Sequence, residues 1–426
     1  MASFFIPLTG LQADSTELNT IANNLANMNT TAFKDQTTNF SDLFYQQIGS
    51  SGPGDPIQSG AGTKVASNSV DFTQGSINST GNATDVALNG NGMFVVGDGS
   101  LREYTRAGNF SLDSSGNLIA QNGWNVMGYP AVNGVVNTNA PLTQINIPVG
   151  QVEQPQASTT MNMTANLDAT STTGASFPSQ ITLYDSLGVS HVATVTYTQT
   201  GTNTWSYSAA LPASEFASGT STPVTGSLTF DSSGNLTSVT PAGAGGPQTV
   251  GTAAGDVSSI SVSFTGLADG AANLNMQWNL LGASGSPTIS QVAAPSAVSA
   301  TEQDGYASGQ YQSFTINANG VVSATFSNGQ QLAVGQVALA NVTNLQGLRM
   351  LGDGDYTTTL ASGEASLGTS GSAGLGTLQD GALEQSNVNI SAEFSRLIIA
   401  QRAFEANSKA VTTFDTVTQD TINMIH

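Results

Sequence analysis

The sequence predicts a mainly β protein with an α-helix at each end. Apolar residues recur every seven positions near both termini, which is typical of helices that pack lengthwise against a partner. The residues between are rich in Thr, Ser, Gly, Asn and Val and carry runs with period-two alternation, which favours strands. We therefore expect helical termini that form a coiled-coil-like inner domain, plus two β-rich domains, the outer one inserted into the other.

The first helix is expected over roughly residues 7–28. Pro7 suits the first turn of a helix, and Asn19, Asn23 and Asn27 fall on its polar side. The apolar positions form two rows with a spacing of seven, Leu11, Leu18 and Leu25 in one row and Ile21 and Met28 in the other.

The second helix is expected at the C-terminal end and is longer. Asn389 is a suitable N-cap and Glu393 suits the first turn, and at about 1.5 Å per residue the helix would be roughly 50 Å long. Two interpretations are open, because Asp14 and Gln401 interrupt the rows: the helices pack on the body of the protein, or they meet each other and neighbouring copies. The row and its flanking residues are Ile390, Leu397, Phe404, Val411, Thr418 and Ile425, with Phe394, Ile398, Phe414 and Ile422 beside them.

A turn unit recurs three times in the β region, at residues 110–118, 228–236 and 314–322. In each unit, alternating apolar residues lead into Asp or Asn, and Gly follows three residues later. Asp and Asn cap their own backbone turn, and Gly adopts a positive φ at little cost. Each unit is therefore expected to be a hairpin turn.

Shifts in composition predict the domain organisation. Linker-like stretches near 49–62, 146–160 and 293–304 mark breaks, and similar turn chemistry on both sides of the central block indicates an insertion. The expected organisation is a helical domain of 1–34 and 380–426, an extended linker of 35–71, a β-rich core domain of 72–145 and 301–379, and an inserted outer β domain of 146–300.

Charge is unusually sparse, since 8% of residues are charged against roughly 25% in a typical soluble domain. Eight Lys and Arg oppose 28 Asp and Glu, and no basic residue lies between Arg106 and Arg349. Neutralising phosphates requires Lys and Arg, so no nucleic-acid partner is expected. No stretch approaches the roughly 18 apolar residues of a membrane helix, and the opening residues do not resemble a secretory signal peptide, so no membrane insertion is expected.

No constellation of residues predicts an enzyme. Cysteine is absent, which excludes a thiolate ligand or a Cys nucleophile. His191, the internal histidine, lies in an alternating run and is expected to point to solvent. Asp353 and Asp355 form a carboxylate pair without the glycine that a calcium loop requires, because Thr358 stands in its place. We expect no catalytic, cofactor-binding or metal-binding residue.

Residues 22–34 closely resemble the N-terminal motif of the bacterial flagellar rod, hook and hook-associated family, and residues 385–410 resemble its C-terminal signature. The pairing of the two signatures at opposite ends is highly specific. Ala32 stands where Gly is commoner in the family, and Asn389 where Asp is commoner. The motif residues are Asn23, Asn24, Asn27, Asn29, Thr30, Phe33 and Lys34 at one end, and Gln401, Arg402, Ala403, Asn407 and Ser408 at the other.

Residues 75–96 and 104–110 resemble the domain that rod and hook proteins share, and the chain length together with residues 184–188 resembles the hook-type members. The resemblance implies a subunit that leaves the cell unfolded through the flagellar type III export apparatus, without a cleaved signal. Outside the cell it would polymerise into the curved tube that transmits motor torque from rod to filament. Its partners would be its own copies, the distal rod protein, the hook cap protein and the hook–filament junction proteins.

In such a tube the terminal helices would line the inner wall and the β domains would form the outer layers. A distal rod protein with an unusual insert remains an alternative within the family. An extracellular β-rich adhesin or carbohydrate-active protein is the alternative from another class. The polymerisation interface would consist of Leu11, Leu18, Ile21, Leu25, Met28, Ile390, Phe394, Leu397, Phe404, Val411 and Ile422.

Overall fold

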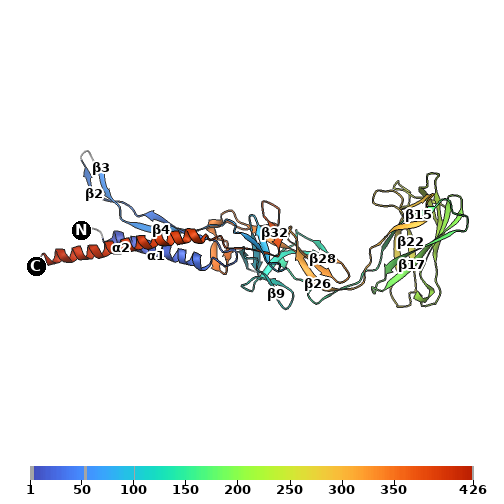
Figure 1. Ribbon diagram of the computed structural model, residues 1–426, viewed down its shortest axis with the longest axis horizontal. Helices are drawn as coiled ribbons and strands as arrows, with labels where there is room; N and C mark the ends of the chain where they lie inside the picture. Colours follow the sequence, from blue (N-terminus) through green and yellow to red (C-terminus); the bar gives the residue numbers. More distant parts are fainter. Residues whose placement is uncertain (1–3, 52–54, 100, 425–426) are drawn as a thin grey trace. The chain divides into compact units, whose positions relative to one another are not determined.

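The computed structural model describes residues 4–51, 55–99 and 101–424, so Ile425 of the predicted row and His426 lie outside the described residues. The fold is mainly β with an α-helix near each end of the described chain, as the sequence predicts. The chain divides into two compact units (Figure 1). The first takes in the described parts of Met1–Val149, Ser313–Thr325 and Gln331–His426, and the second takes in Gly150–Gln312 and Phe326–Gln330.

The helices α1 (Phe5–Ala26) and α2 (Ile390–Asn423) lie side by side and run in opposite directions (Figure 1). α2 has 34 residues and is therefore about 50 Å long. Its N-cap is Asn389, whose side-chain oxygen accepts hydrogen bonds from the backbone N–H groups of Ser391 and Ala392, which confirms the predicted start. Within the described chain, neither helix has the combination of length and apolarity that spanning a membrane requires.

Residues 35–71, which we expected to be an extended linker, are organised by strand pairing into two antiparallel ladders. The ladder formed by residues 36–42 and 63–70 packs against α1. There the hydroxyl oxygens of Thr38 and Thr20 lie 2.9 Å apart. The segment is therefore an ordered β-ribbon attached to the first helix. The paired strands are β1 (Gln36–Asp42) with β4 (Thr63–Val70) and β2 (Gln46–Ser51) with β3 (Asp55–Ser59).

An antiparallel sheet forms the body of the first unit, with the central strand order β28-β11-β7-β8-β30-β29. Strand β7 is buried along its whole length because it is a continuous apolar run. Besides β1–β4, the strands of this unit are β5 (Ile77–Ser79), β6 (Val86–Asn89), β7 (Met93–Gly97), β8 (Arg102–Thr105), β9 (Ser111–Leu112), β10 (Leu118–Ile119), β11 (Asn125–Val132), β12 (Val135–Val136), β13 (Thr143–Gln144), β27 (Val321–Phe326), β28 (Gln331–Asn341), β29 (Arg349–Gly352), β30 (Asp355–Thr357), β31 (Ser366–Thr369), β32 (Thr377–Asp380) and β33 (Ala382–Glu384), with the short helix η2 (Leu345–Gly347).

Two sheets share one apolar core in the second unit. Trp278 from one sheet packs edge-on against Tyr207 from the other, with ring centroids 5.4 Å apart. One sheet comprises β15 (Thr160–Asp168), β22 (Ser259–Phe264), β23 (Leu274–Asn279), β24 (Ile289–Val292) and β25 (Ala297–Gln303). The other comprises β16 (Ser176–Tyr184), β17 (Ser190–Gly201), β18 (Thr204–Ala210), β19 (Val224–Phe230), β20 (Leu236–Pro241) and β21 (Gln248–Thr249), with the short helix η1 (Ala213–Glu215) after β18.

The chain enters and leaves the second unit along a pair of strands. β14 (Val152–Glu153) pairs antiparallel with β26 (Gly309–Ile316), in a register that sets Val152 opposite Gln310 and Glu153 opposite Gly309. Residues far apart in the sequence are therefore neighbours at this point, as an inserted segment requires.

The three recurring turn units fold as predicted. Gly116, Gly234 and Gly320 have φ values of 82°, 82° and 81°. In each unit the preceding Asp or Asn accepts two backbone N–H groups of its own turn: Asp113 from Ser115 and Asn117, Asp231 from Ser233 and Asn235, and Asn317 from Asn319 and Val321. The positive φ explains the glycine, and the side-chain acceptor explains the Asp or Asn.

The prediction that His191 points to solvent is wrong, because its side chain is only 2% exposed. β17 alternates as expected, but the buried face carries His191 together with Ala193, Val195 and Tyr197. Carboxylates surround the ring, and this compensates its burial. Burial on its own would lower the pKa of His191, but the hydrogen bonds and charges of Asp185 and Glu215 outweigh burial and raise that pKa.

Candidate assembly interface

The face of α1 that is buried within the chain is small and polar. Its buried residues are Pro7, Gly10, Ala13, Asp14, Thr20, Ile21 and Asn24, which recur at helical spacing. Gly10 allows α2 to approach closely, since a Cβ at this position would lie 2.6 Å from the side-chain nitrogen of Asn407. The leucine row of the predicted interface borders this face and is only half-buried.

α2 leaves most of its apolar surface open to solvent. Glu393 and Ala400 are its buried residues within the described chain. Ile390, Phe394 and Ile398 follow one another at i, i+4 and i+8 along the helix, which places them on one stripe, and they are 45%, 52% and 59% exposed. An apolar stripe that the chain itself leaves uncovered is typical of a surface that packs against another molecule.

The predicted site residues therefore fall into three groups. Buried are Ile21, Asn24 and Lys34. Half-buried are Leu11, Leu18, Leu25, Asn27, Phe33, Leu397, Ala403, Asn407, Ser408 and Val411. Exposed are Asn23, Met28, Asn29, Thr30, Ile390, Phe394, Gln401, Arg402, Phe404 and Ile422.

Buried polar contacts fix how α1 and α2 align. The side-chain amide of Asn24, which is fully buried, donates to Gln36 O at 2.7 Å and to Glu393 Oε2 at 3.1 Å, and its oxygen accepts from the backbone of Gln36 at 3.1 Å. Further along the helices, Asn407 donates to Asp14 at 2.8 Å. A shift of one helix along the other would break the Asn24–Glu393 and Asn407–Asp14 hydrogen bonds between groups that are buried or half-buried, so the contacts favour one alignment.

A buried ion cluster joins the N-terminal motif to the strand that precedes α2. Lys34 Nζ lies 2.6 Å from Glu384 Oε1, and an Arg106 guanidinium nitrogen lies 2.9 Å from Glu384 Oε2. The backbone N–H of Gly75 donates to the same carboxylate at 2.9 Å. Burial lowers the pKa of Lys34, and the charge of Glu384 partly offsets this.

Arg106 uses its remaining donors on the β sheet. It donates to the carbonyl oxygens of Gly90 and Gly92 at 2.7 and 2.9 Å and to that of Leu88 at 3.2 Å. The planar guanidinium suits several acceptors at once. Arg106 and Glu384 were not among the predicted site residues. Arg106 does lie in residues 104–110, which resemble the domain that rod and hook proteins share, and it is one of only eight basic residues.

The exposed end of the N-terminal motif borders a cavity of about 690 Å³. Asn23, Asn27, Asn29, Thr30 and Phe33 line it on one side, and strands β29 and β30 line it on the other. Local hydrogen bonds shape this end of the motif: Asn27 donates to Asn23 O at 2.9 Å, and Thr30 donates to Asn27 at 3.1 Å. All of the predicted N-terminal motif residues except Asn24 therefore line one hollow.

Ala32 ends this turn in the left-handed region, with φ of 56°. A non-glycine residue in this region is strained by roughly 1–2 kcal/mol. Its backbone N–H donates to Glu384 O at 2.9 Å, which anchors the turn to strand β33. The backbone geometry explains why glycine would suit this position better.

The two antiparallel helices leave an apolar stripe uncovered, and a buried ion cluster joins them to the β sheet of the first unit. This arrangement is typical of a structural subunit that packs against other molecules. Family models match along the chain: Flagella basal body rod protein at residues 8–34, Flagellar hook protein FlgE/F/G D1 domain at 87–166, Flagellar basal body protein FlaE D2 domain at 155–306, and Flagellar basal body rod FlgEFG protein C-terminal at 379–424.

Relatives match over the full length of the chain. The flagellar hook protein FlgE of Borreliella burgdorferi is 33% identical over 100% of this chain and 99% of its own, and that of Salmonella typhimurium is 34% identical over 99% and 100%. The chain belongs to the family of bacterial flagellar hook proteins, the structural subunits of the flagellar hook. The crystal structure of Helicobacter pylori flagellar hook protein FlgE2 has a similar fold, with a TM-score of 0.55 over 72% of this chain and 100% of that chain at 16% identity.

Proposed function

We propose that the chain polymerises outside the cell into the curved hook tube that transmits torque from the rod to the filament, and that α1 and α2 line the inner wall of that tube. The observation that carries this proposal is the uncovered apolar stripe of α2, Ile390, Phe394 and Ile398. Burying such side chains between subunits contributes on the order of 25 cal/mol per Å². Rows repeated in every copy would give a continuous, torsionally stiff wall.

The domains would then have different roles. Residues 1–34 and 380–426 would form the inner tube, the ribbon of residues 35–71 would connect outward, and the β sheet of the first unit would form the surrounding layer. The second unit, residues 150–312 and 326–330, would form the outer layer, which shifts the edges of the expected insert from 146–300. The buried cluster of Lys34, Arg106 and Glu384 supports this arrangement, because it ties the helical ends firmly to the surrounding β layer.

The outer layer must exchange contacts as the hook bends and rotates. The second unit contains no Lys or Arg, since neither occurs between Arg106 and Arg349. On a surface of Thr, Ser, Gly and Asn, no single contact between neighbouring subunits is much more stable than another. Apolar patches would instead stabilise one arrangement strongly. Several neighbouring arrangements of nearly equal energy are what a bending joint requires.

The proposal extends to export and partners. The subunit would pass unfolded through the flagellar type III export apparatus without a cleaved signal, and it would meet the distal rod protein at one end of the tube. The hook cap protein and the hook–filament junction proteins would bind at the other end. Its work would be mechanical, with no enzymatic reaction. Full-length similarity to hook proteins favours the hook over a distal rod protein, an adhesin or a carbohydrate-active protein.

The test is polymerisation of the purified chain followed by electron microscopy. Phe394→Glu should abolish tubes, because it would bury an unpaired charge between subunits at a cost of several kcal/mol. Its circular dichroism should match the wild type, since Phe394 is 52% exposed in the single chain. Thr173→Glu, which adds the same charge on an exposed loop of the second unit, is the matched control and should polymerise. Normal tubes from Phe394→Glu would refute the proposed interface.

A further inference from the structure

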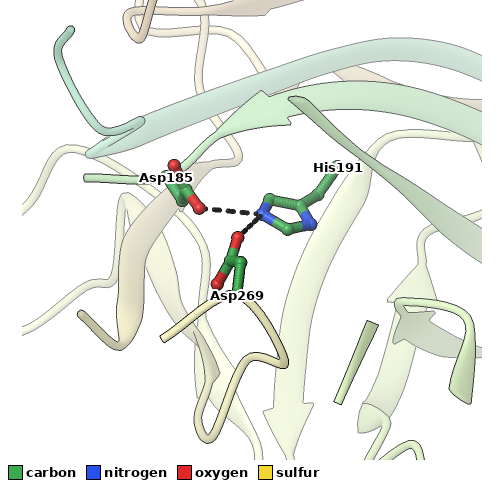
Figure 2. Close-up of side chains that lie close together, drawn as sticks. All are labelled: Asp185, His191 and Asp269. Carbon is green, nitrogen blue, oxygen red and sulfur yellow. Dashed lines mark hydrogen bonds and ion pairs between the residues drawn. The ribbon is translucent and has the colours of Figure 1, made fainter. Parts of the chain in front are cut away.

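The second unit contains a histidine enclosed by carboxylates. Asp185, His191 and Asp269 point toward one another (Figure 2). His191 Nε2 lies 3.2 Å from Asp185 Oδ2 and 3.4 Å from Asp269 Oδ2, and its Nδ1 lies 2.9 Å from Glu215 Oε2. The imidazole is buried, the Asp185 side chain is fully buried, and the Asp269 side chain is 24% exposed.

One oxygen of each aspartate accepts backbone N–H groups, and the other oxygen faces the ring. Asp185 Oδ1 accepts the backbone N–H groups of Leu187 and Val189, both at 2.8 Å. Asp269 Oδ1 accepts the backbone N–H of Ala271 at 3.0 Å. Each Oδ2 is thereby directed at Nε2, so both aspartates are held in place before any ligand arrives.

The loops that carry these residues are bonded to one another. The backbone N–H of Ala268 donates to Glu215 O at 2.9 Å, and that of Ala272 donates to the hydroxyl of Ser186 at 3.0 Å. Hydrogen bonds between these three segments of the chain hold the side chains in position, which is typical of a preorganised site.

The hydrogen bond between Glu215 and Nδ1 influences whether Nε2 turns a lone pair or an N–H toward the aspartates. In the neutral tautomer that carries its proton on Nδ1, Glu215 accepts that N–H, and the Nε2 lone pair then faces two carboxylate oxygens. Either a proton on Nε2 or a metal cation between the three atoms makes this arrangement attractive. The chain supplies no Lys or Arg for this role anywhere in the second unit.

We propose that Asp185, His191 and Asp269 bind a divalent transition-metal ion of the zinc class, with Glu215 as the positioning residue that orients the imidazole. The edge of a tetrahedron with metal–ligand bonds of about 2.0–2.1 Å is about 3.3–3.4 Å, close to the two measured Nε2–oxygen distances. The three ligand atoms all lie within 4.8 Å of one another.

The donor set and the exposure of Asp269 determine the kind of ion and how it enters. An imidazole nitrogen with two carboxylate oxygens suits zinc, whereas Ca²⁺ and Mg²⁺ prefer oxygen alone. Three protein ligands leave a fourth position for water, on the side where Asp269 meets solvent. A bound ion would clamp the loops at residues 185–191, 213–217 and 266–272 together and stiffen this end of the second unit.

The test is calorimetric titration of ZnCl₂ into the full-length monomer after treatment with EDTA. We expect one saturable site in the wild type and at least tenfold weaker binding in Asp269→Asn, whose exposed side chain can change without unfolding the unit. Asp231→Asn is the matched control: it removes the same charge from the same unit, in a turn whose counterpart carries Asn317, and it should bind like the wild type. Glu215→Gln keeps an acceptor for Nδ1–H and should bind within a few-fold.

Thermal unfolding gives a second measurement. At a free Zn²⁺ concentration one hundred times the Kd, the Tm of the second unit should rise by about 5–10 °C, and Asp269→Asn should show no such rise. Co²⁺ in place of Zn²⁺ should give the visible absorption of a tetrahedral site. Absence of saturable binding, or equal binding and an equal Tm rise in Asp269→Asn, would overturn the proposal and leave His191 as an ion-paired imidazolium.

Discussion

Removal of the buried carboxylate of Glu384 should lower the stability of the first unit and leave that of the second unit unchanged. Glu384→Gln keeps the size of the side chain but leaves Lys34 and Arg106 without their counter-ion. The side chains are 0%, 1% and 7% exposed, and the nitrogen–oxygen distances are 2.6 and 2.9 Å. Breaking such a buried pair costs about 3–5 kcal/mol. Because Lys34 can relieve part of this by losing its proton, we expect a loss of about 3 kcal/mol.

The assay is urea unfolding of the full-length monomer, followed by far-ultraviolet circular dichroism and by proteolysis at each urea concentration. The first unit should unfold at lower urea, whereas the second, which does not contain Glu384, should be unchanged and so serves as an internal reference. Glu405→Gln is the matched control, because Glu405 pairs with Arg402 at 3.1 Å where both side chains are exposed, and it should cost less than about 1 kcal/mol. Equal effects of the two substitutions would refute the reasoning.

Two further predictions concern a buried acid and the inserted unit. Burial raises the pKa of Asp355 to about 6, so the folded state binds an extra proton between about pH 4 and 6, and the contribution of this group to stability falls as pH rises through that window. Asp355→Asn should therefore gain about 2–3 kcal/mol over the wild type at pH 7 and little at pH 4; a constant difference in chemical denaturation across this range would contradict it. Replacing residues 154–308 by Asn-Gly, which joins the paired Glu153 and Gly309, should preserve export and tube assembly but give straight or irregularly curved hooks; normally curved hooks in micrographs would rule out a shaping role.

Local chemistry was predictable from the sequence. Asn389 caps α2 because its acceptor satisfies the free N–H groups of the first turn, and Gly116 adopts positive φ because the turn requires it. Both depend on neighbours a few residues away. The mainly β fold with helical termini follows from the same short-range periodicities.

Long-range pairing was not predictable. Glu384 meets Lys34 across 350 residues of sequence, and period-two alternation does not say which face of β17 is buried, so His191 was assigned to the wrong side. The heptad rows likewise identified the leucines of α1, whereas the face buried within the chain uses Gly10 and Asn24. A single sequence carries no signal for such contacts, because they depend on which elements the fold brings together.

A cryo-electron microscopy reconstruction of tubes grown from this chain would show which residues line the channel and which are buried between copies. We expect α1 and α2 to form the innermost wall, with Ile390, Phe394 and Ile398 buried against neighbouring copies. A tube in which the β units line the channel, or in which this stripe of α2 faces solvent, would overturn the proposed assembly.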